Sequence, residues 1–359
     1  MSGKKKPYFS IVMPAYGVES YIEKAIKSIQ DQTYADWEII VVDDKTPDRS
    51  AQIAERMAEA DERIRVVRHE KNQGLGPARN TGMDEARGEY IWFMDPDDYV
   101  DGDILEKIRD SLIKNPAEAV IFGLIEEYYD RKGNLDYTHV ICPEERLYDS
   151  QEELRRAVIY LEQQTLYGYA WNKVYNLEYM REMRFRFENV KLIEDIHFNV
   201  QYFMDIKRLN VLGIAPYHYA KRMGKNLTNA YVPEYFRLHK QRIEMLFDQL
   251  SYWNLCTRRS REILGSLYAR YILSALERNC DGRSGMRNAQ RYQWCRRLFA
   301  QGLFNELIPQ AKAADSKILS LSIVFLRMRK AIPCMMMGRG IYMIRKMFPM
   351  VYSRVKSER

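Results

Sequence analysis

The sequence predicts an α/β protein in which a mostly parallel, Rossmann-like sheet carries helices on both faces and is followed by a C-terminal α-helical region. Two observations predict this fold class. In the N-terminal part of the chain, apolar segments of strand length alternate with amphipathic segments of helix length. Beyond about residue 230, only the helical spacing of apolar residues continues. We therefore expect two domains, residues 1–230 and residues 231–359.

The first domain is expected to alternate strands and helices in a regular order. Its strands are predicted at 9–13, 37–42, 64–69, 89–94 and 119–123. Its helices are predicted near 21–29, 50–60, 76–86 and 102–114, and Pro77 suits the first turn of the third helix. Ser20 and Glu23 have the spacing of a capping box for the first helix.

The composition is that of a folded protein from a reducing compartment. Hydrophobic residues make up 46% of the 359 residues and charged residues 29%, which excludes a disordered chain. The five cysteines are scattered and form no CxxC pair, so neither a disulfide framework nor a zinc site is expected. The basic start MSGKKKPYF is followed by an apolar run that Pro14 interrupts, so no secretory signal is expected. We expect a cytoplasmic location.

The net charge of +7 comes from the C-terminal tail. From Lys317 onward, ten lysines and arginines stand against one acid, Glu358, so the tail carries +9 and the rest of the chain about −2. Before the tail, apolar residues at helical spacing predict helices over 235–250 and 257–281. We expect no nucleic acid partner, and the sequence leaves the oligomeric state open.

The tail combines aliphatic and methionine clusters with regularly spaced basic residues. Its longest mostly apolar run, 318–326, has about nine residues, half of what a bilayer span requires. A basic amphipathic segment of this kind suits an anionic membrane surface. The alternative is a helical cap that packs on the core and exposes a basic face. We favour peripheral contact with the inner face of the plasma membrane, because lipid-linked acceptors of polymer assembly are found there.

Polar residues cluster where the predicted strands end. In open parallel sheets, ligands bind at the carboxyl ends of the strands. The four exits are residues 14–17, 43–45, 72–80 and 95–98. Taken singly, each acidic exit also suits an ordinary turn, and Asp101 suits a cap for the helix that follows. Several such exits on one edge favour a binding site.

The acids Asp95, Asp97 and Asp98 predict a site for a metal-bound diphosphate. Proteins commonly hold Mg²⁺ or Mn²⁺ with one or two carboxylates and the phosphates of the substrate. Such a cation relieves the repulsion among the acids and neutralises charge on a departing diphosphate. Asp44 can accept a hydrogen bond from a base edge, and the guanidinium of Arg79 can hold a phosphate or a base.

Longer stretches of the chain resemble family 2 glycosyltransferases of the GT-A fold. The resemblance is carried by SIVMPAYGVESYIEKAIKSIQDQTYADWEIIVVDD and NQGLGPARNTGMDEARGEYIWFMDPDDYV. It continues through YAWNKVYNLEYM, IEDIHFNVQYF and APYHYAKRMGKNLT. These motifs stand in the family's order and cover roughly residues 7–230. The resemblance implies an inverting enzyme of the bacterial polysaccharide type, whose first domain binds a nucleotide sugar.

The resemblance implies nucleotide binding by five residues at the strand exits. Pro14, Ala15 and Tyr16 match the first-strand motif that lines the nucleotide. Asp44 matches the acid that binds uracil, and Arg79 matches a basic residue near the nucleotide.

The resemblance places the metal and catalytic roles on acids. Asp95, Asp97 and Asp98 match the motif that binds ribose and the divalent metal, Mn²⁺ or Mg²⁺, and we expect Asp97 and Asp98 to lie closest to both. Asp195, which follows Glu194, matches the catalytic base of these inverting enzymes. A sugar hydroxyl needs a positioned base to take its proton during attack, and a carboxylate within hydrogen-bond reach can do so. The alternative for this acidic pair is an ordinary first turn of a helix.

Some features depart from the family pattern or stay ambiguous. Gly17 stands where Asn is usual, and 45–47 reads Lys-Thr-Pro where Gly-Ser-Thr is usual, which leaves the loop contacts and the nucleotide in doubt. Trp171, like Glu194, suits contact with the sugar or acceptor, yet Trp171 equally suits the core. Aromatic and basic residues between 217 and 225 can form a basic flap over the diphosphate, or they can form a solvated strand end. These residues are Tyr217, His218, Tyr219, Lys221, Arg222 and Lys225.

The predicted function is transfer of a sugar from a nucleotide sugar, expected to be a UDP-sugar, to a hydroxyl of a glycan or lipid-linked acceptor in cell-surface polysaccharide assembly. A nucleotidyltransferase that makes sugar nucleotides would share the fold and the acids, but it should begin with a Gly-rich basic loop where this chain has PAYGVESY. A non-catalytic, receiver-like metal-binding module would also place acids at strand ends, but it would not need 359 residues. The donor sugar, the acceptor and the linkage stay open.

Overall fold

The structure is a computed structural model that describes residues 6–130, 132–190, 192–222, 231–313 and 316–347. Its coordinates divide into two compact units, Met1–Arg222 and Met223–Arg359. We call them the sheet unit and the helical unit and describe each by itself. The domain boundary expected at residue 230 falls at the end of 223–230, a stretch outside the described residues.

One half of the sheet unit is a parallel sheet. Its strands follow the order β3-β2-β1-β4, and all neighbours run parallel. All residues of β1 and β2 are buried, because helices cover both faces of these central strands. The strands are β1 (Phe9–Ala15), β2 (Trp37–Asp43), β3 (Ile64–Arg68) and β4 (Tyr90–Phe93), so the first four predicted strands are confirmed.

The other half of the sheet is mixed. β9 (Lys173–Asn176) lies between β4 and β6 (Ala119–Tyr129) and runs antiparallel to both, whereas β10 (Leu209–Arg222) runs parallel to β6. Two short strands, β5 (Tyr99–Val100) and β8 (Arg146–Tyr148), pair antiparallel with β10. A further strand, β7 (Leu135–Ile141), pairs antiparallel with β6. The sequence predicted only the start of β6 and, of the strands that follow, offered only a strand end near 217–222 as an alternative. In β10, Gly213 and Pro216 interrupt the apolar pattern.

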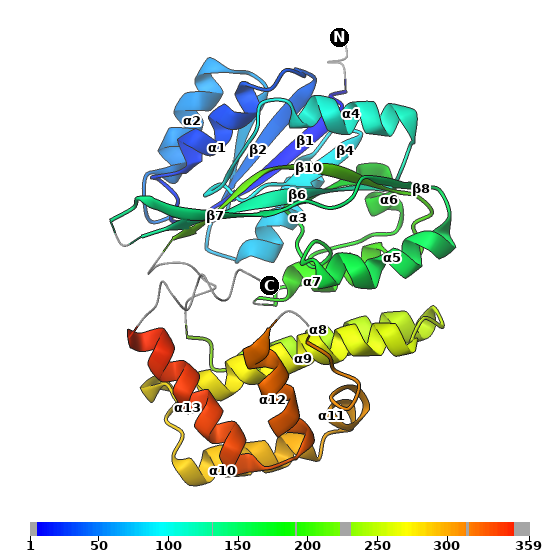
Figure 1. The fold of residues 1–359 in the computed structure, drawn as a ribbon. Coiled ribbons are helices and arrows are strands. Elements are labelled where there is room, and N and C mark those ends of the chain that lie inside the picture. The colour runs from blue at the N-terminus through cyan, green and yellow to red at the C-terminus, as the bar shows by residue number, and fades with distance from the viewer. Residues whose placement is uncertain (1–5, 131, 191, 223–230, 314–315, 348–359) are drawn as a thin grey trace. The chain divides into compact units, whose positions relative to one another are not determined.

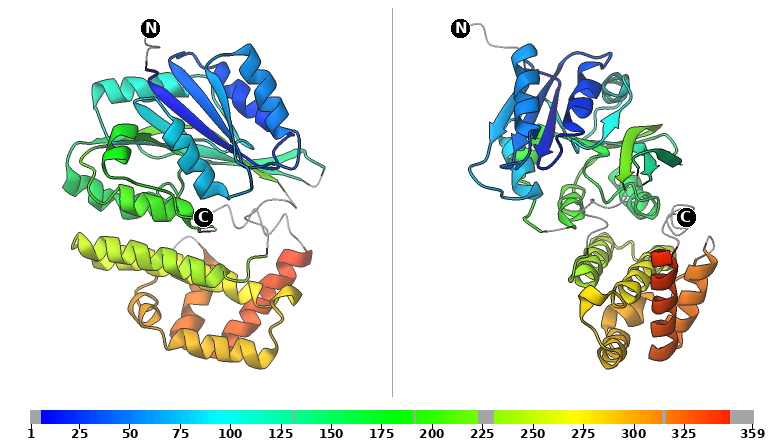
Figure 2. Two further views of the ribbon diagram at one scale, coloured as in Figure 1. Left: turned by 180° about the vertical axis from the view of Figure 1, so that it is seen from behind. Right: turned by 90° about the vertical axis from the view of Figure 1, so that its left-hand side faces the viewer.

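Helices cover both faces of this sheet. Figures 1 and 2 show α1 (Ile22–Gln30), α2 (Ser50–Ala60) and α4 (Ile104–Lys114) on one face, and α3 (Leu75–Glu85) and α6 (Leu177–Glu182) on the other. The unit also contains α5 (Gln151–Gln163) and α7 (Glu194–Tyr202). The four predicted helices are confirmed, together with the prediction of helices on both faces.

Two predicted helix caps are wrong. α1 begins after Tyr21 without a side-chain cap, and Glu23 pairs with Lys27 at 2.7 Å instead of closing a box with Ser20. α4 follows Asp103, while the carboxylate of Asp101 lies 3.0 Å from Nε2 of His218. In both places the acid pairs with a basic residue outside the predicted capping motif, Lys27 for Glu23 and His218 for Asp101. The spacing of residues within the motif does not reveal these partners.

A close approach of α3 to β1 positions the start of α3 at the carboxyl edge of the sheet. Gly82 of α3 lies against Val12 of β1, and a Cβ at Gly82 would lie 2.9 Å from Cγ2 of Val12. Because only glycine permits this contact, α3 rests directly on the strand. Arg79, one turn earlier in α3, is thereby held beneath the strand exits.

The helical unit is built around α9 (Arg258–Arg278), which packs against α8, α11, α12 and α13. Its other helices are α8 (Tyr235–Tyr252), α10 (Asn288–Phe299), α11 (Gly302–Leu307), α12 (Lys317–Arg327) and α13 (Ala331–Met347). The two predicted helices, 235–250 and 257–281, are confirmed as α8 and α9. Within the described residues, no helix is long and apolar enough to cross a membrane.

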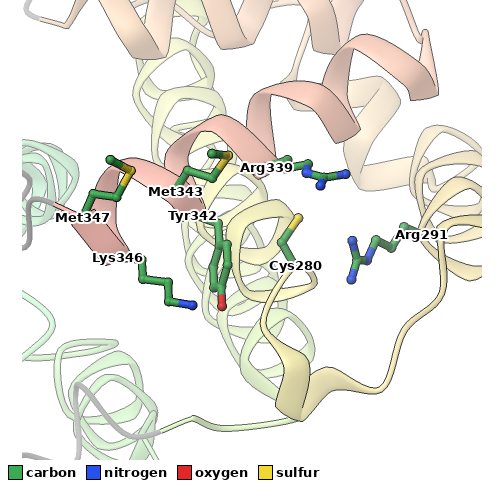
Figure 3. Close-up of a pocket in the computed structure, with 7 residues that line it drawn as sticks. All are labelled: Cys280, Arg291, Arg339, Tyr342, Met343, Lys346 and Met347. Carbon is green, nitrogen blue, oxygen red and sulfur yellow. The ribbon is translucent and has the colours of Figure 1, made fainter.

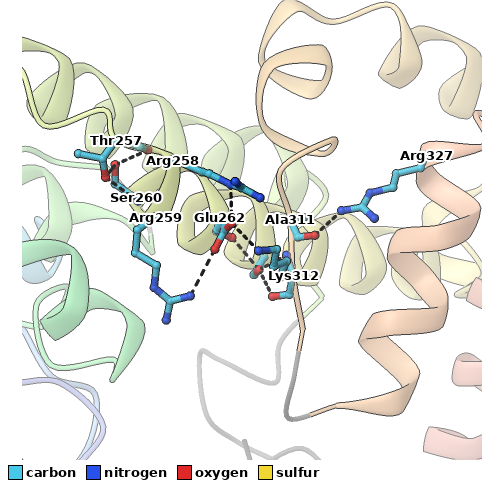
Figure 4. A network of polar contacts seen from close by, with 9 residues as sticks. Thr257, Arg258, Arg259, Ser260, Glu262, Ala311, Lys312 and Arg327 are labelled. Carbon is cyan, nitrogen blue, oxygen red and sulfur yellow. Dashed lines mark hydrogen bonds and ion pairs between the residues drawn. The ribbon is translucent and has the colours of Figure 1, made fainter.

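Polar contacts fix the N-terminal end of α9. The side chain of Thr257 caps the helix by accepting a hydrogen bond from the amide of Ser260. One turn later, the buried carboxylate of Glu262 lies 2.6 Å from Nζ of Lys312 and 3.3 Å from Nε of Arg258 (Figure 4). These contacts tie the segment after α11 to α9.

Candidate active site

Arg79 connects the acidic strand exit to the acidic start of α7. Its side chain is 1% exposed, and its guanidinium forms ion pairs with Asp195 and, at 3.1 Å, with Asp95. Burial alone would lower the pKa of Arg79, but the charges of Asp195 and Asp95 raise this pKa above its ordinary value. Its Nε has no hydrogen-bond partner among the described residues. The fork that we expected to hold a phosphate or base therefore points at two carboxylates.

Asp195 is held in the first turn of α7 by two donors. One oxygen of its carboxylate pairs with Arg79, and the other accepts a hydrogen bond from the amide of Ala170 at 2.9 Å. The side chain is 15% exposed, so it stays accessible to a small group. Asp195 therefore lies in the first turn of a helix, as the alternative interpretation expected, and its catalytic role stays a prediction.

Glu194 is a buried carboxyl group with little compensation. Its Oε2 has no hydrogen-bond partner among the described residues. Burial, followed by the charge of Asp195, raises the pKa of Glu194 to about 7. The side chain is thus poised to change its protonation state near neutral pH.

The three acids after β4 differ in how the fold uses them. Asp98 is 2% exposed, and its carboxylate accepts hydrogen bonds from the hydroxyl of Tyr217 at 2.8 Å and the amide of Ala220 at 2.9 Å. Asp95 and Asp97 keep 25% and 37% of their side chains exposed. The structure therefore offers Asp95 and Asp97 to a ligand, whereas the sequence favoured Asp97 and Asp98.

Burial also shifts the pKa values of these acids upward. It raises the pKa of Asp95 to about 7, although Arg79 opposes the shift, and it raises the pKa of Asp97 against the opposing charge of Arg222. Burial raises the pKa of Asp98 well above its usual range, and the neighbouring acids add to this shift. In all three cases the fold disfavours the charged form, so a cation at this edge would be stabilising.

The acids outnumber the basic groups that contact them. Five carboxyl groups lie here, and among the residues that the structure describes only two guanidinium groups, those of Arg79 and Arg222, form ion pairs with them. The acids are Asp95, Asp97, Asp98, Glu194 and Asp195. Among the described residues, no group of three or more acids, histidines or cysteines is arranged to hold a metal by itself. A metal at Asp95 and Asp97 would therefore need further ligands from a substrate.

Asp44 organises the loop that leads into α3. Its carboxylate accepts hydrogen bonds from the amides of Gln73 and Gly74, both at 2.8 Å, and lies 2.7 Å from Nδ1 of His69. Asp44 is 3% exposed. Nε2 of His69 in turn lies 2.9 Å from the hydroxyl of Thr81 in α3. The carboxylate of Asp44 therefore stabilises the loop at Gln73 and Gly74. Its contact with uracil stays a prediction.

The first strand exit presents Tyr16. Pro14 and Ala15 are buried in β1, whereas the side chain of Tyr16 is 53% exposed. The amide of Gly17 donates a hydrogen bond to the hydroxyl of Thr46 at 2.9 Å. The two departures from the family pattern thus contact each other.

Trp171 and the proposed basic flap lie within the fold. Trp171 is 3% exposed and stacks on Tyr217 with ring centroids 4.5 Å apart, which corresponds to its core alternative. Residues 217–222 form the end of β10, where Lys221 pairs with Glu126 and Arg222 lies 3.6 Å from the carboxylate of Asp97. Lys225 lies outside the described residues.

Sequence reasoning missed the donors that hold these acids. Tyr217 follows Asp98 by more than a hundred positions, and the amide of Ala170 leaves no mark in the sequence. No sequence motif marks His69 as the partner of Asp44. No spacing rule links residues whose contact depends on how β9 and β10 enter the sheet.

Comparison with known families places the N-terminal part of the chain. Residues 10–184 match the family described as glycosyl transferase family 2. This part of the chain belongs to that family. The family 2 segment contains Asp44, Arg79 and the acids 95–98, and it ends before Asp195.

Curated relatives carry glycosyltransferase names. The chain is 35% identical over 232 residues to "Uncharacterized glycosyltransferase EpsJ" of Bacillus subtilis, a match that covers 63% of this chain and 65% of EpsJ. It is 27% identical over 234 residues to the poly(ribitol-phosphate) beta-N-acetylglucosaminyltransferase TarS of Staphylococcus aureus, covering 64% of this chain and 38% of TarS. The chain thus spans less than two thirds of the length of these relatives.

A solved structure shares the fold. The crystal structure of S. aureus TarS 1–349 in complex with UDP-GlcNAc aligns over 94% of this chain and 91% of that chain, with a TM-score of 0.61 and 20% identity. At this identity the likeness concerns the fold, and it confirms the GT-A fold that the family 2 resemblance predicted.

Proposed function

We propose that the chain is an inverting glycosyltransferase that moves a sugar from a UDP-sugar to a hydroxyl group of a glycan or lipid-linked acceptor in cell-surface polysaccharide assembly. The observation that carries this proposal is the position of Asp195. Its carboxylate is fixed by Arg79 and by the amide of Ala170, and Arg79 ties it to Asp95 at the strand exit. A proton acceptor thus lies beside the acids of the predicted diphosphate site.

The proposed role of Asp195 is that of a general base. A carboxylate can accept about four hydrogen bonds, and the described contacts of Asp195 use two of these positions. In the proposed reaction, the acceptor oxygen bonds to the anomeric carbon while the bond from that carbon to the diphosphate breaks on the opposite side. Asp195 takes the proton of the attacking hydroxyl. Attack from the side opposite the leaving group inverts the anomeric carbon.

We propose Mn²⁺ or Mg²⁺ as the cofactor, held by Asp95 and Asp97 with phosphate oxygens of the donor. The donor set suits such a hard cation, since these two carboxylates are partly exposed and the fold disfavours their charged forms. When bound, the cation supplies positive charge for the departing diphosphate. Asp98, which is tied to Tyr217 and Ala220, shapes the turn that carries Asp95 and Asp97.

The proposed nucleotide site lies along the first two strand exits. Tyr16 offers an exposed ring for the base, and Pro14 and Ala15 form the strand end behind it. Asp44 holds the loop at Gln73 and Gly74, which the base would also approach. UDP is the proposed nucleotide because Asp44 matches an acid that binds uracil and because TarS, which shares the fold, has been crystallised with UDP-GlcNAc.

The acceptor side of the proposal includes the membrane. We propose that the chain works as a peripheral protein at the inner face of the plasma membrane, with the basic C-terminal tail as the contact. The support is the tail's charge of +9 together with its interspersed apolar residues. Residues 348–359 of this tail lie outside the described part of the chain.

A panel of UDP-sugars and GDP-sugars tests the proposed function. Binding would be measured by calorimetry, and slow hydrolysis of the donor would be followed with Mn²⁺, with Mg²⁺ and with a chelator. We expect one or more UDP-sugars to bind and to be hydrolysed only in the presence of metal. Preference for GDP-sugars would contradict the role given to Asp44, and hydrolysis that persists in the chelator would contradict the metal proposal.

A further inference from the structure

The helical unit contains a cavity of about 580 Å³ whose lining residues all belong to this unit. Its walls come from Cys280 in the turn after α9, from α10 and from one face of α13 (Figure 3). Three basic side chains and three apolar or aromatic ones carry the argument: Arg291, Arg339, Lys346, Tyr342, Met343 and Met347. None of the described residues that line the cavity is acidic.

The basic side chains at this cavity are not neutralised by the fold. Arg291, Arg339 and Lys346 form no ion pair with any residue that the structure describes, and Nε of Arg291 is buried without a hydrogen-bond partner there. By contrast, Arg345, also on α13, lies 3.0 Å from the carboxylate of Glu277. The cavity therefore presents positive charge that is free for an anion.

The wall formed by α13 is also apolar on its exposed side. Buried residues of α13, including Gly338 and Ile341, pack inward, and a Cβ on Gly338 would lie 2.6 Å from the carbonyl oxygen of Leu276 in α9. The exposed side carries Met336, Met343 and Met347, with exposed fractions of 70%, 51% and 64%. Arg339 and Lys346 lie on this same exposed side, and a helix face that combines exposed methionines with basic side chains favours contact with an anionic, partly apolar surface.

Positive charge is not a general property of the cavities in this unit. A second cavity of about 550 Å³ lies against α8 and α11, and its charged lining residues are all acids: Glu244, Asp248 and Glu306. Two of these acids pair with Lys240 and Arg261, and no basic residue is among the described residues that line this cavity. The combination of basic and apolar side chains at α13 is therefore local.

We propose that the cavity at α13 binds the phosphate headgroup of an anionic phospholipid in a membrane surface. Arg291, Arg339 and Lys346 would attract the headgroup phosphate from different parts of the cavity wall, while Met343 and Met347 would contact the boundary with the acyl chains. Basic side chains near an anionic leaflet and apolar side chains in the interface both favour membrane binding. This inference rests on the proposed function, which places the chain at a membrane, and it names the residues that make the contact.

Vesicle co-sedimentation of the full chain tests this proposal. The vesicles would consist of phosphatidylcholine alone or of phosphatidylcholine mixed with phosphatidylglycerol. We expect binding to the mixed vesicles, weakened by salt, and little binding to phosphatidylcholine alone. Equal binding to both kinds of vesicle would overturn the proposal, because the headgroup charge would then play no part.

Paired substitutions separate the cavity from charge in general. The double variant Arg339→Gln/Lys346→Gln removes two charges and should weaken binding to the mixed vesicles about 30-fold. The matched control, Arg296→Gln/Arg297→Gln, removes two exposed charges from α10 outside the cavity and should bind almost as the unchanged protein does. Equal losses in both variants would show that only net charge matters and would overturn the proposal.

A third variant tests the apolar half of the site. Met343→Ser/Met347→Ser keeps every charge and should bind the mixed vesicles several-fold more weakly. Unchanged binding would overturn the assignment of α13 to the interface. Competition by soluble glycerol phosphate that is as strong as competition by vesicles would instead assign the cavity to a soluble phosphate.

The outcome is independent of the sugar-transfer proposal. Hydrolysis of the UDP-sugar without vesicles would be measured for every variant, and we expect it to stay unchanged, since none of these residues lies in the sheet unit. Loss of vesicle binding with full hydrolysis supports the lipid site. Full vesicle binding in a protein that hydrolyses no nucleotide sugar would contradict the sugar-transfer proposal and leave the lipid site standing.

Discussion

The sheet unit and the helical unit both concentrate charge, but they balance it in opposite ways. In the sheet unit, buried and partly buried acids outnumber the described basic groups that pair with them, and Arg79, Tyr217 and two backbone amides hold Asp195 and Asp98 in place. In the helical unit, Arg339 and Lys346 are exposed and form no ion pair among the described residues. The charged groups of the sheet unit therefore contribute to its stability through their ion pairs and hydrogen bonds, whereas Arg339 and Lys346 on α13 contribute little to the stability of the helical unit.

The largest expected effect is loss of transfer in Asp195→Asn. An amide does not take the proton of an attacking hydroxyl, so we expect turnover to fall by about 10²- to 10⁴-fold. Binding of UDP should persist, because the predicted nucleotide contacts lie at the strand exits. Turnover with the acceptor and calorimetry with UDP measure the two quantities.

The control for this variant is Asp149→Asn, which changes an exposed acid before α5 in the same unit. Asp149→Asn should keep both sugar transfer and UDP binding. Full transfer by Asp195→Asn would refute the general-base role and leave the fold assignment untouched.

The second prediction concerns stability at the centre of the acidic cluster. Arg79→Met leaves the partly buried Asp195 and Asp95 without their shared counterion, so the free energy of unfolding should fall by about 3–5 kcal/mol. Urea unfolding measures this change. As a control, Arg56→Met removes an ion pair with Glu23 in which the arginine side chain is 65% exposed, and it should cost at most about 1 kcal/mol. Equal losses would show that the buried pairs contribute no more than a surface pair.

The third prediction uses the raised pKa of Glu194. Because burial raises its pKa from 4.5 to about 7, Glu194 contributes stability below about pH 4.5 that is lost as the pH rises through 7. Glu194→Gln should therefore gain stability over the unchanged protein as the pH rises, by about 3 kcal/mol at most. Urea unfolding at about pH 5 and about pH 8 measures this difference. A difference that is the same at both pH values would contradict the shift, and the exposed Glu144→Gln is the matched control.

The smallest expected effect is on the helical unit. Arg339→Gln/Lys346→Gln should change the free energy of unfolding by no more than about 0.5 kcal/mol, because both side chains are exposed and unpaired among the described residues. Urea unfolding in the absence of lipid measures it. A loss comparable to that of Arg79→Met would end the contrast between the two units, since the charges at α13 would then be part of the fold.

The parts of the fold that the sequence predicted are those with strong local patterns. The strands β1 to β4 and the helices α1 to α4 have continuous apolar runs or clear helical spacing, and both kinds of element appear as expected. The strands β9 and β10 were not predicted, because a four-residue strand and a strand broken by Gly213 and Pro216 lack such a pattern. These segments form strands because they pair with β4 and β6 in the sheet.

For the candidate site, the sequence by itself determined which side chains are available and on which edge of the sheet they gather. Asp95, Asp97, Asp98 and Asp44 follow strands whose carboxyl ends must meet, so their clustering depends on chain direction alone. Only the tertiary structure decided how each is used. It buried Arg79 between Asp195 and Asp95, joined Asp98 to Tyr217, and turned Asp44 toward its own loop. The physical reason is that burial and partner choice depend on residues far apart in the chain, which come together only when β9, β10 and α7 complete the sheet unit.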